Sequence, residues 1–204
     1  GRRDARFRGG KRVPFARLEA ATGGRSIDPA ALADRVEPFR AMRAAAGDGL
    51  ELLCDLGGAW QLEPALAIAE ALQPFDLTWL EDPLPAEDLD GLRELAAATR
   101  IPLAGHESRA GVDSFRALVE SGAISVVHID VQWCGGVGEA RRIAALAAER
   151  ELPVAFHDCA GPVAWASSVH AALAIPNASW VECTRPYAFD AYPAMAEGTP
   201  RLAD

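Results

Sequence analysis

The stretch LELLCDLGGAWQLEPALAIAEAL, residues 50–72, decides the fold class of this chain. It opens with the apolar run 50–55, continues through a loop with two glycines, and ends in a helical pattern with Pro64 in its first turn. An apolar run of this length before a helical pattern is typical of one strand and the helix that follows it. The stretch therefore predicts one βα unit with a buried strand.

The same order of strand, loop and helix returns along the rest of the chain. We expect further strands at residues 77–81, 102–105, 126–130, 153–157 and 180–182, and helices at 88–98, 113–121, 137–150 and 163–174. Strands that alternate with helices of this length predict a parallel sheet. So many successive units favour a closed (β/α) barrel of the TIM type, with a doubly wound open sheet as the alternative. No G-x-G-x-x-G motif follows a strand, so nothing supports a dinucleotide site.

The region before residue 50 provides fewer elements than a full barrel needs. We expect a strand at residues 13–20 and a helix at 29–46, which Asp28 would cap. The connection between them is too short for another βα unit. The count is then about seven strands, whereas the fold has eight and typically ~250 residues. The sequence thus predicts a single, incomplete α/β barrel domain over residues 13–204, after a basic lead-in over residues 1–12.

Composition limits the functions open to the chain. Half of the 204 residues are apolar and a quarter are charged, and no apolar run approaches the ~20 residues of a membrane span. The net charge is −9, although six of the first twelve residues are basic. We interpret this short basic lead-in as a solvated segment and expect no nucleic-acid or membrane partner. The four cysteines are widely spaced and no apolar leader is present, which indicates a reduced, cytoplasmic protein.

Chemistry in a (β/α) barrel sits on one rim, at the C-terminal ends of the strands. In this chain an ionisable residue closes each of six consecutive strands: Asp55, Glu81, Glu107, Asp130, His157 and Glu182. The intervals between them are 26, 26, 23, 27 and 25 residues, which is one βα unit each time. Six such residues in register indicate a functional site rather than chance.

The first three of these residues are carboxylates, which repel one another at neutral pH unless a positive charge neutralises them. Arginine or lysine partners are one solution, but the chain has a single lysine, Lys11. Oxygen ligands suit a hard cation, and Mg²⁺ binds through a few carboxylates together with water and substrate oxygens. For each acid alone, a solvated rim position is the simpler interpretation. Their regular spacing favours one divalent-metal site of Asp55, Glu81 and Glu107.

Asp130 and His157 end neighbouring strands. A carboxylate beside an imidazole orients the ring and raises its basicity, as a general acid or base requires. Glu182 ends the next strand and is a candidate hydrogen-bond or proton donor. The simpler interpretation of His157 is a rim histidine satisfied by its neighbours. The other histidines are weaker candidates: we expect His106 to face away from Glu107, His128 to lie one layer deeper than Asp130, and His170 to be structural within a helix.

In their local settings, these residues resemble the barrel domain of the enolase superfamily, mandelate-racemase subgroup. The stretches that carry the resemblance are CDLGGAW (54–60), WLEDPL (79–84), AGHES (104–108), HIDVQWCGG (128–136), FHDCAGPV (156–163) and WVEC (180–183). Each motif alone is weak, whereas their combination in this order, from about residue 8 to residue 187, is highly specific. The stretch GGKRVPFA (9–16) resembles the family's link from its N-terminal capping domain into the first barrel strand.

The resemblance implies roles for the six rim residues. Asp55, Glu81 and Glu107 match the three Mg²⁺ ligands of the family. Asp130 and His157 match its Asp–His dyad, and Glu182 matches an acid that assists stabilisation of the intermediate in some members. The implied reaction abstracts the proton α to the carboxylate of a small-molecule substrate.

Two outcomes of this proton abstraction are open. The run HDCAGPV (157–163) is most similar to the acid-sugar dehydratases, which implies loss of a β-hydroxyl and a 2-keto-3-deoxy acid product. A racemase or epimerase of a 2-hydroxy acid would need the family's K-x-K pair on the second barrel strand, and we find neither that strand nor its lysine. In many dehydratases a histidine two residues after the first metal ligand replaces that lysine, and here this position is Gly57.

The sequence also lacks the N-terminal α+β capping domain of the family. An uncapped barrel without one unit exposes sheet edges and core surface, which favours a homo-oligomer. A catalytically silent partial barrel therefore stays open beside the dehydratase, and the racemase ranks below both.

Overall fold

The computed structural model of the chain describes residues 7–200. The chain divides into two compact units, Gly1–Ala104 and Gly105–Asp204. None of the helices among the described residues is long and apolar enough to cross a membrane. The four cysteines all lie in this part of the chain and form no disulfide.

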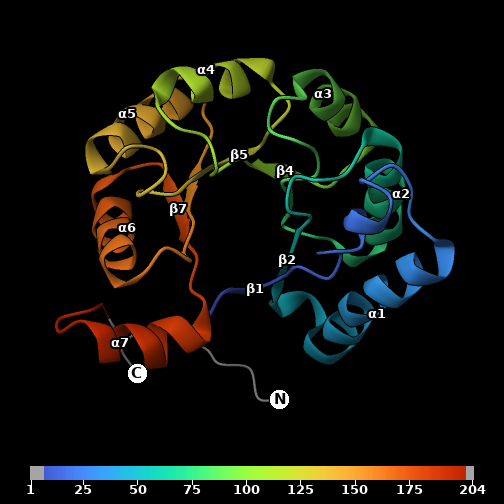
Figure 1. Ribbon diagram of the computed structural model, residues 1–204, viewed down its shortest axis with the longest axis horizontal. Helices are drawn as coiled ribbons and strands as arrows, with labels where there is room; N and C mark the ends of the chain where they lie inside the picture. The colour runs from blue at the N-terminus through green and yellow to red at the C-terminus, as the bar shows by residue number, and fades with distance from the viewer. Residues whose placement is uncertain (1–6, 201–204) are drawn as a thin grey trace. The chain divides into compact units, whose positions relative to one another are not determined.

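In the described part of the first unit, parallel strands alternate with α-helices (Figure 1). In chain order the elements are β1 (Gly9–Arg12), α1 (Pro29–Ala46), β2 (Glu51–Asp55), α2 (Leu62–Leu72), β3 (Trp79–Glu81), α3 (Leu89–Ala98) and β4 (Leu103–Gly105). Strands that follow one another along the chain are neighbours in the sheet. The helices α1, α2 and α3 pack on one another in the same order.

Local sequence explains where α1 begins. The side chain of Asp28 accepts hydrogen bonds from the backbone N–H groups of Ala30 and Ala31 at 3.0 and 2.9 Å. Pro29 stands at the first helical position, where its missing N–H has no intrahelical partner to lose. The helix predicted at residues 29–46 is thereby confirmed at both ends.

The first strand lies earlier in the chain than the sequence predicts. The expected strand at residues 13–20 is wrong, because turns and the 3₁₀ helix Glu19–Ala21 occupy this segment. Arg17 has a φ of 71°, which an extended strand cannot accommodate. The strand instead is Gly9–Arg12, within the stretch expected to be a basic lead-in. The first six residues of that lead-in lie outside the described residues.

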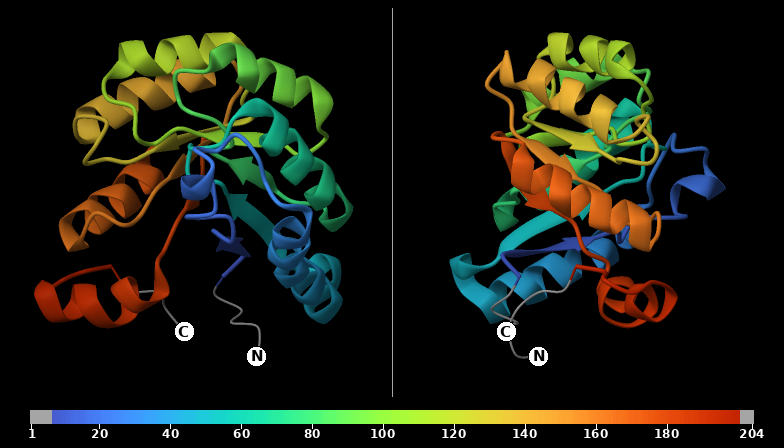
Figure 2. Two further views of the ribbon diagram at one scale, coloured as in Figure 1. Left: turned by 45° about the vertical axis from the view of Figure 1, so that its right-hand side comes forward. Right: turned by 90° about the vertical axis from the view of Figure 1, so that its left-hand side faces the viewer.

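The described part of the second unit continues the alternation of parallel strands and helices. Its elements are α4 (Val112–Ser121), β5 (Val126–Ile129), α5 (Val137–Ala148), β6 (Val154–Phe156), α6 (Pro162–Ala174), β7 (Ala178–Val181), the π-helical turn Tyr187–Ala191 and α7 (Tyr192–Met195). The strands β5, β6 and β7 pair in this order. Helix α6 packs on α5 and lies against β6 and β7 (Figure 2).

These elements confirm the fold class predicted from the sequence. The described residues hold seven strands that alternate with helices, and within each unit the strands are parallel and pair in chain order. This is the α/β arrangement of an incomplete TIM-type (β/α) barrel.

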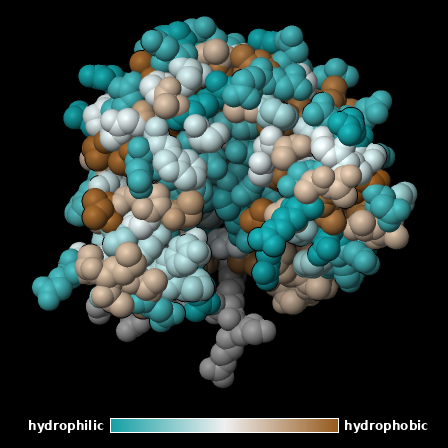
Figure 3. Space-filling view, in the orientation of Figure 1, coloured by the Kyte–Doolittle hydropathy of each residue, from teal (hydrophilic) through white to brown (hydrophobic). Residues whose placement is uncertain are grey.

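The second unit exposes apolar side chains on α5 and α6. The exposed fractions are 42 % for Val137, 77 % for Val163 and 82 % for Leu173. Figure 3 shows hydrophobic surface, in brown, on the side of these helices. Exposed apolar patches suit a protein partner, and the homo-oligomer expected from the sequence stays a prediction.

Candidate active site

Two carboxylates close neighbouring strands of the first unit. Asp55 is the last residue of β2 and Glu81 the last residue of β3, and the two are register partners in this parallel pair. Glu81 is 1 % exposed, and the indole Nε1 of Trp79 donates a hydrogen bond to its Oε2 at 3.0 Å. The structure thus places both predicted residues side by side at C-terminal strand ends.

A lysine stands beside this pair of carboxylates. Lys11 lies on β1, the neighbour of β2, and its Nζ is 2.5 Å from Oε1 of Glu81 and 3.7 Å from Oδ2 of Asp55. The first strand therefore brings a lysine beside the Asp55 strand, although its sequence, GGKR, contains no K-x-K pair. The sequence placed the strand before α1 at residues 13–20, and for this reason it did not place Lys11 on a strand.

The carboxylates of Asp55 and Glu81 lie close together and largely out of solvent, with Lys11 beside them. Burial, and next the charge of Glu81, raise the pKa of Asp55 to about 6, although Lys11 and the N–H of Gly57 lower it. The Gly57 N–H donates to Oδ1 of Asp55 at 2.8 Å. One ammonium group cannot neutralise two carboxylates. Paired, largely buried carboxylates, of which Asp55 has a raised pKa, fit a divalent cation such as Mg²⁺.

Asp130 and His157 form a hydrogen-bonded pair in the second unit. Asp130 follows β5, His157 follows β6, and Oδ2 of Asp130 lies 2.9 Å from Nδ1 of His157. The indole ring of Trp133 lies beside the imidazole, with 5.1 Å between ring centroids. The structure therefore brings together the two residues that the sequence predicts as a dyad.

The loop after β5 holds the Asp130 carboxylate in its ionised form. Its Oδ1 accepts hydrogen bonds from the backbone N–H groups of Gln132 at 2.7 Å and Trp133 at 3.1 Å. Burial raises the pKa of Asp130, but the hydrogen bond from His157 and these two N–H groups outweigh it, so the pKa is lowered overall. An ionised Asp130 can stabilise a positive charge on His157 whenever the imidazole takes up a proton.

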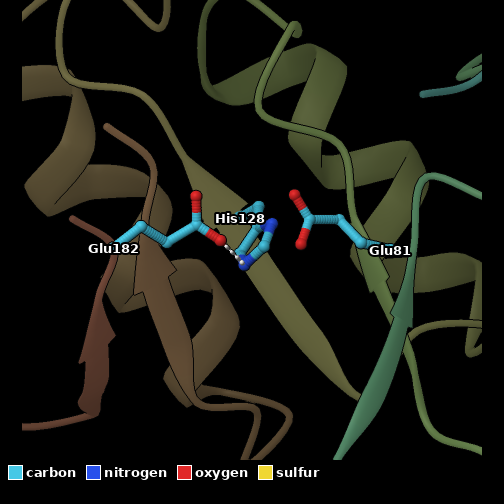
Figure 4. Close-up of side chains that lie close together, drawn as sticks. All are labelled: Glu81, His128 and Glu182. Carbon is cyan, nitrogen blue, oxygen red and sulfur yellow. Dashed lines mark ion pairs between the residues drawn. The ribbon is translucent and has the colours of Figure 1, made fainter. Parts of the chain in front are cut away.

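His128 lies between two other predicted rim residues of the second unit. Its Nδ1 is 4.0 Å from Oε2 of Glu107, and its Nε2 is 3.9 Å from Oε1 of Glu182. Figure 4 shows the Glu182 carboxylate directed at the His128 ring, while the third residue drawn, Glu81, belongs to the first unit. The sequence ranks His128 as a weaker candidate in a deeper layer. Its fully buried ring nevertheless links two rim carboxylates, which only the geometry reveals.

The remaining histidines have no assigned role in this site. His106 is 1 % exposed and directly precedes Glu107 in the chain. His170 lies within α6, as the sequence predicts, and is exposed.

A family model described as enolase C-terminal domain-like matches residues 3–204. The chain belongs to this family. The match confirms the resemblance found in the sequence motifs, and it covers nearly the whole chain.

Curated relatives of this enolase C-terminal domain-like chain include two sugar-acid dehydratases. The D-xylonate dehydratase of Haloferax volcanii is 32 % identical over 72 % of this chain and 36 % of the relative. The arabinonate dehydratase of Saccharolobus solfataricus is 25 % identical over 84 % of this chain and 44 % of the relative. The chain thus spans less than half the length of these two relatives.

A solved structure supports the same family. It is an enolase of the mandelate racemase subgroup from Agrobacterium tumefaciens, with a TM-score of 0.83 and 40 % sequence identity. The similarity covers 87 % of this chain and 49 % of the other.

Proposed function

We propose that this chain carries the catalytic residues of a Mg²⁺-dependent dehydratase that acts on an acid sugar. The observation that carries the proposal is the 2.9 Å contact between Asp130 and His157 at the strand ends of the second unit. The names of two relatives, arabinonate dehydratase and D-xylonate dehydratase, support a small-molecule sugar carboxylate as the substrate. A homo-oligomeric state and a cytoplasmic location stay predictions from the sequence.

His157 is the proposed acid and base of this reaction. Its Nε2 takes the proton from the carbon next to the substrate carboxylate, and Asp130 stabilises the resulting imidazolium. The imidazolium then returns the proton to the β-hydroxyl group, which leaves as water. The C–H and C–O bonds break, a C=C bond forms, and the enol product tautomerises to a 2-keto-3-deoxy acid. One residue on one face of the substrate therefore suffices for a syn elimination.

Asp55, Glu81 and Glu107 are the proposed Mg²⁺ ligands. The largely buried position of Asp55 and Glu81, and the raised pKa of Asp55, support the first two. Glu107 is proposed from its motif AGHES (104–108) alone. When bound, Mg²⁺ would hold the substrate carboxylate and stabilise the negative charge that it gains as the α-proton leaves. Glu182 is the proposed hydrogen-bond donor that assists the same charge.

A racemase or epimerase of a 2-hydroxy acid is the second candidate. Lys11 on β1 supplies a lysine on a strand next to the Asp55 strand, which the sequence did not reveal. Its ammonium group contacts two carboxylates, however, and this is the environment of a counter-ion rather than of a base. The dehydratase therefore stays the first proposal. A catalytically silent partial barrel is the remaining alternative.

One experiment separates these three functions. The purified chain is incubated with Mg²⁺ and a panel of sugar acids, including arabinonate, xylonate and galactonate, in D₂O. A 2-keto-3-deoxy acid, detected as its semicarbazone, is the result expected of a dehydratase. Exchange of the α-proton for deuterium without a keto product would instead identify a racemase or epimerase. Neither product nor exchange with any acid would overturn the proposal in favour of the silent barrel.

A further inference from the structure

A buried carboxylate joins the loop after β6 to the segment after β7. Asp158 is 4 % exposed, although it lies in a loop. Its Oδ1 accepts a hydrogen bond from the hydroxyl of Tyr192 at 3.0 Å, and its Oδ2 accepts one from the N–H of Thr184 at 3.2 Å. Its backbone carbonyl accepts a third, from Oγ1 of Thr184 at 3.1 Å. Asp158 is therefore bonded through both carboxylate oxygens and its backbone to residues far along the chain.

Tyr192 holds the other end of the same loop. Its hydroxyl oxygen accepts a hydrogen bond from the N–H of Gly161 at 3.3 Å, directly before α6. The ring is 3 % exposed and packs with Trp165 and Ala188. Burial, and next the charge of Asp158, raise the pKa of Tyr192 to about 12. The hydroxyl therefore keeps its proton at neutral pH and donates it to Asp158.

This cluster of Asp158, Thr184 and Tyr192 begins where the pairing of β6 with β7 ends. The last registered pair is Phe156 with Val181, and the N–H of Glu182 donates to the carbonyl of Phe156 at 2.8 Å. The residues that follow this last pair on β6 and β7 are His157 and Glu182, both proposed to take part in catalysis. Directly after them, the hydrogen bonds between Asp158 and Thr184 connect the two segments again. The backbone at His157 and Glu182 is thus held by the Glu182 N–H bond to Phe156 and by the bonds between Asp158 and Thr184.

We infer that Asp158 is a positioning residue, which together with Thr184 and Tyr192 fixes the placement of His157 relative to Glu182. The effect of this placement on catalysis rests on the proposed function. The position of His157 itself is a property of the folded second unit and can be measured without any reaction. Burying a carboxylate in a loop is unfavourable unless hydrogen bonds compensate for the lost water. Here two hydrogen bonds to the Asp158 carboxylate do so, next to the point where His157 and Glu182 leave their strands. A small displacement of such groups reduces catalysis strongly, by up to about a hundredfold for 1 Å.

The two tyrosines of the chain provide a matched pair of variants. Tyr192→Phe removes the hydroxyl that bonds Asp158. Tyr187→Phe removes a hydroxyl from the neighbouring ring, 5.7 Å away between centroids and 44 % exposed. We expect Tyr192→Phe to lower kcat about tenfold with KM within about twofold of wild type, because the reacting groups are misplaced while substrate binding persists. Tyr187→Phe is expected to leave both constants unchanged.

A second measurement reports the position of His157 in the absence of any substrate. Nitrogen-15 NMR of the imidazole side chains reports the hydrogen bond between Nδ1 of His157 and Asp130, and His157→Asn assigns the signal. Tyr192→Phe and Asp158→Asn are both expected to shift the His157 resonances, while those of exposed His170 on α6 stay in place. Thr184→Ser keeps the hydroxyl and should match wild type, whereas Thr184→Val should shift His157.

The outcomes separate the inference from the proposed function. Unshifted His157 resonances in both Tyr192→Phe and Asp158→Asn would overturn the inference, even if both variants melt at lower temperature, because Asp158 would then be structural only. A wild-type chain without turnover on any sugar acid would overturn the proposed function. Whether or not the chain is active, the NMR comparison tests whether Asp158 and Tyr192 fix the position of His157.

Discussion

The ammonium nitrogen of Lys11 lies 2.5 Å from Oε1 of Glu81, so the only lysine of the chain is paired with a buried carboxylate of the proposed metal site. This pairing has a consequence for metal affinity. A positive charge close to the ligands of a cation repels that cation, and the effect is large where the site is buried. Lys11→Met should therefore bind Mg²⁺ more tightly than wild type, by about tenfold, in isothermal titration calorimetry.

The control for Lys11 is a positive charge elsewhere in the first unit. Arg40 on α1 is 65 % exposed and pairs with Glu37, so Arg40→Met should leave Mg²⁺ affinity unchanged. Equal or weaker Mg²⁺ binding by Lys11→Met would mean that the lysine does not act as a competing counter-ion at this site.

Mg²⁺ should stabilise the folded chain through the same carboxylates. A ligand that binds only the folded state, at a hundredfold excess over its Kd, adds about 2.7 kcal/mol to the free energy of unfolding. For a chain of this size the expected rise in Tm is about 5–10 °C relative to EDTA. Glu81→Gln should remove most of this rise, whereas Glu37→Gln on the exposed face of α1 should keep it. A full Mg²⁺ response in Glu81→Gln would exclude Glu81 from the ligand set.

His157→Asn tests the proposed acid and base. The asparagine amide is not a base and cannot replace Nε2 of the imidazole, so dehydration of the best sugar acid should fall at least about a hundredfold, measured as semicarbazone formation. The Mg²⁺-dependent rise in Tm should persist, because His157 is not among the proposed ligands. His170→Asn, on exposed α6, serves as the control and should retain wild-type rates. Full activity of His157→Asn would assign the proton transfer to another residue.

Much of the fold was predictable because each strand and helix has a local cause. The apolar run before Asp55 is a buried strand, and the capping side chain of Asp28 marks the start of α1. The rim residues followed from these elements, since parallel strands end on the same side. Asp130 and His157 could thus be paired from the sequence without any measured distance.

The strand β1 could not be predicted in the same way. Its sequence, GGKR, has two glycines, two basic residues and no apolar alternation, so only its pairing with β2 makes it a strand. A side chain at Gly9 would lie 2.7 Å from the carbonyl oxygen of Glu51, so glycine there permits the close approach of the two strands. The role of Lys11 was hidden for this reason. The sequence named His128 only as a weaker candidate, because its distances to Glu107 and Glu182 depend on ring placement, which no spacing in the sequence encodes.

The lowered pKa of Asp130 predicts how stability depends on pH. Burial opposes ionisation, but hydrogen bonds from His157 and two backbone N–H groups outweigh it and lower the pKa below the ordinary value of 3.8. The folded state therefore holds this proton less tightly than the unfolded state does. The stabilisation is fully present above pH 3.8 and is lost as the pH falls through the lower, folded-state pKa.

Asp130→Asn removes the ionisable carboxyl group, so comparison with wild type isolates the contribution of this group to the free energy of unfolding. In urea unfolding of metal-free protein, the difference in free energy of unfolding between wild type and Asp130→Asn should shrink as the pH falls below about 4. Asp34→Asn, an exposed position on α1, should differ from wild type by no more than about 0.5 kcal/mol at any pH. A wild-type advantage over Asp130→Asn that stays undiminished at pH 3 would contradict the prediction. It would mean that Asp130 stabilises the fold through interactions that do not need its charge, and His157 would then lack the ionised partner that its proposed role requires.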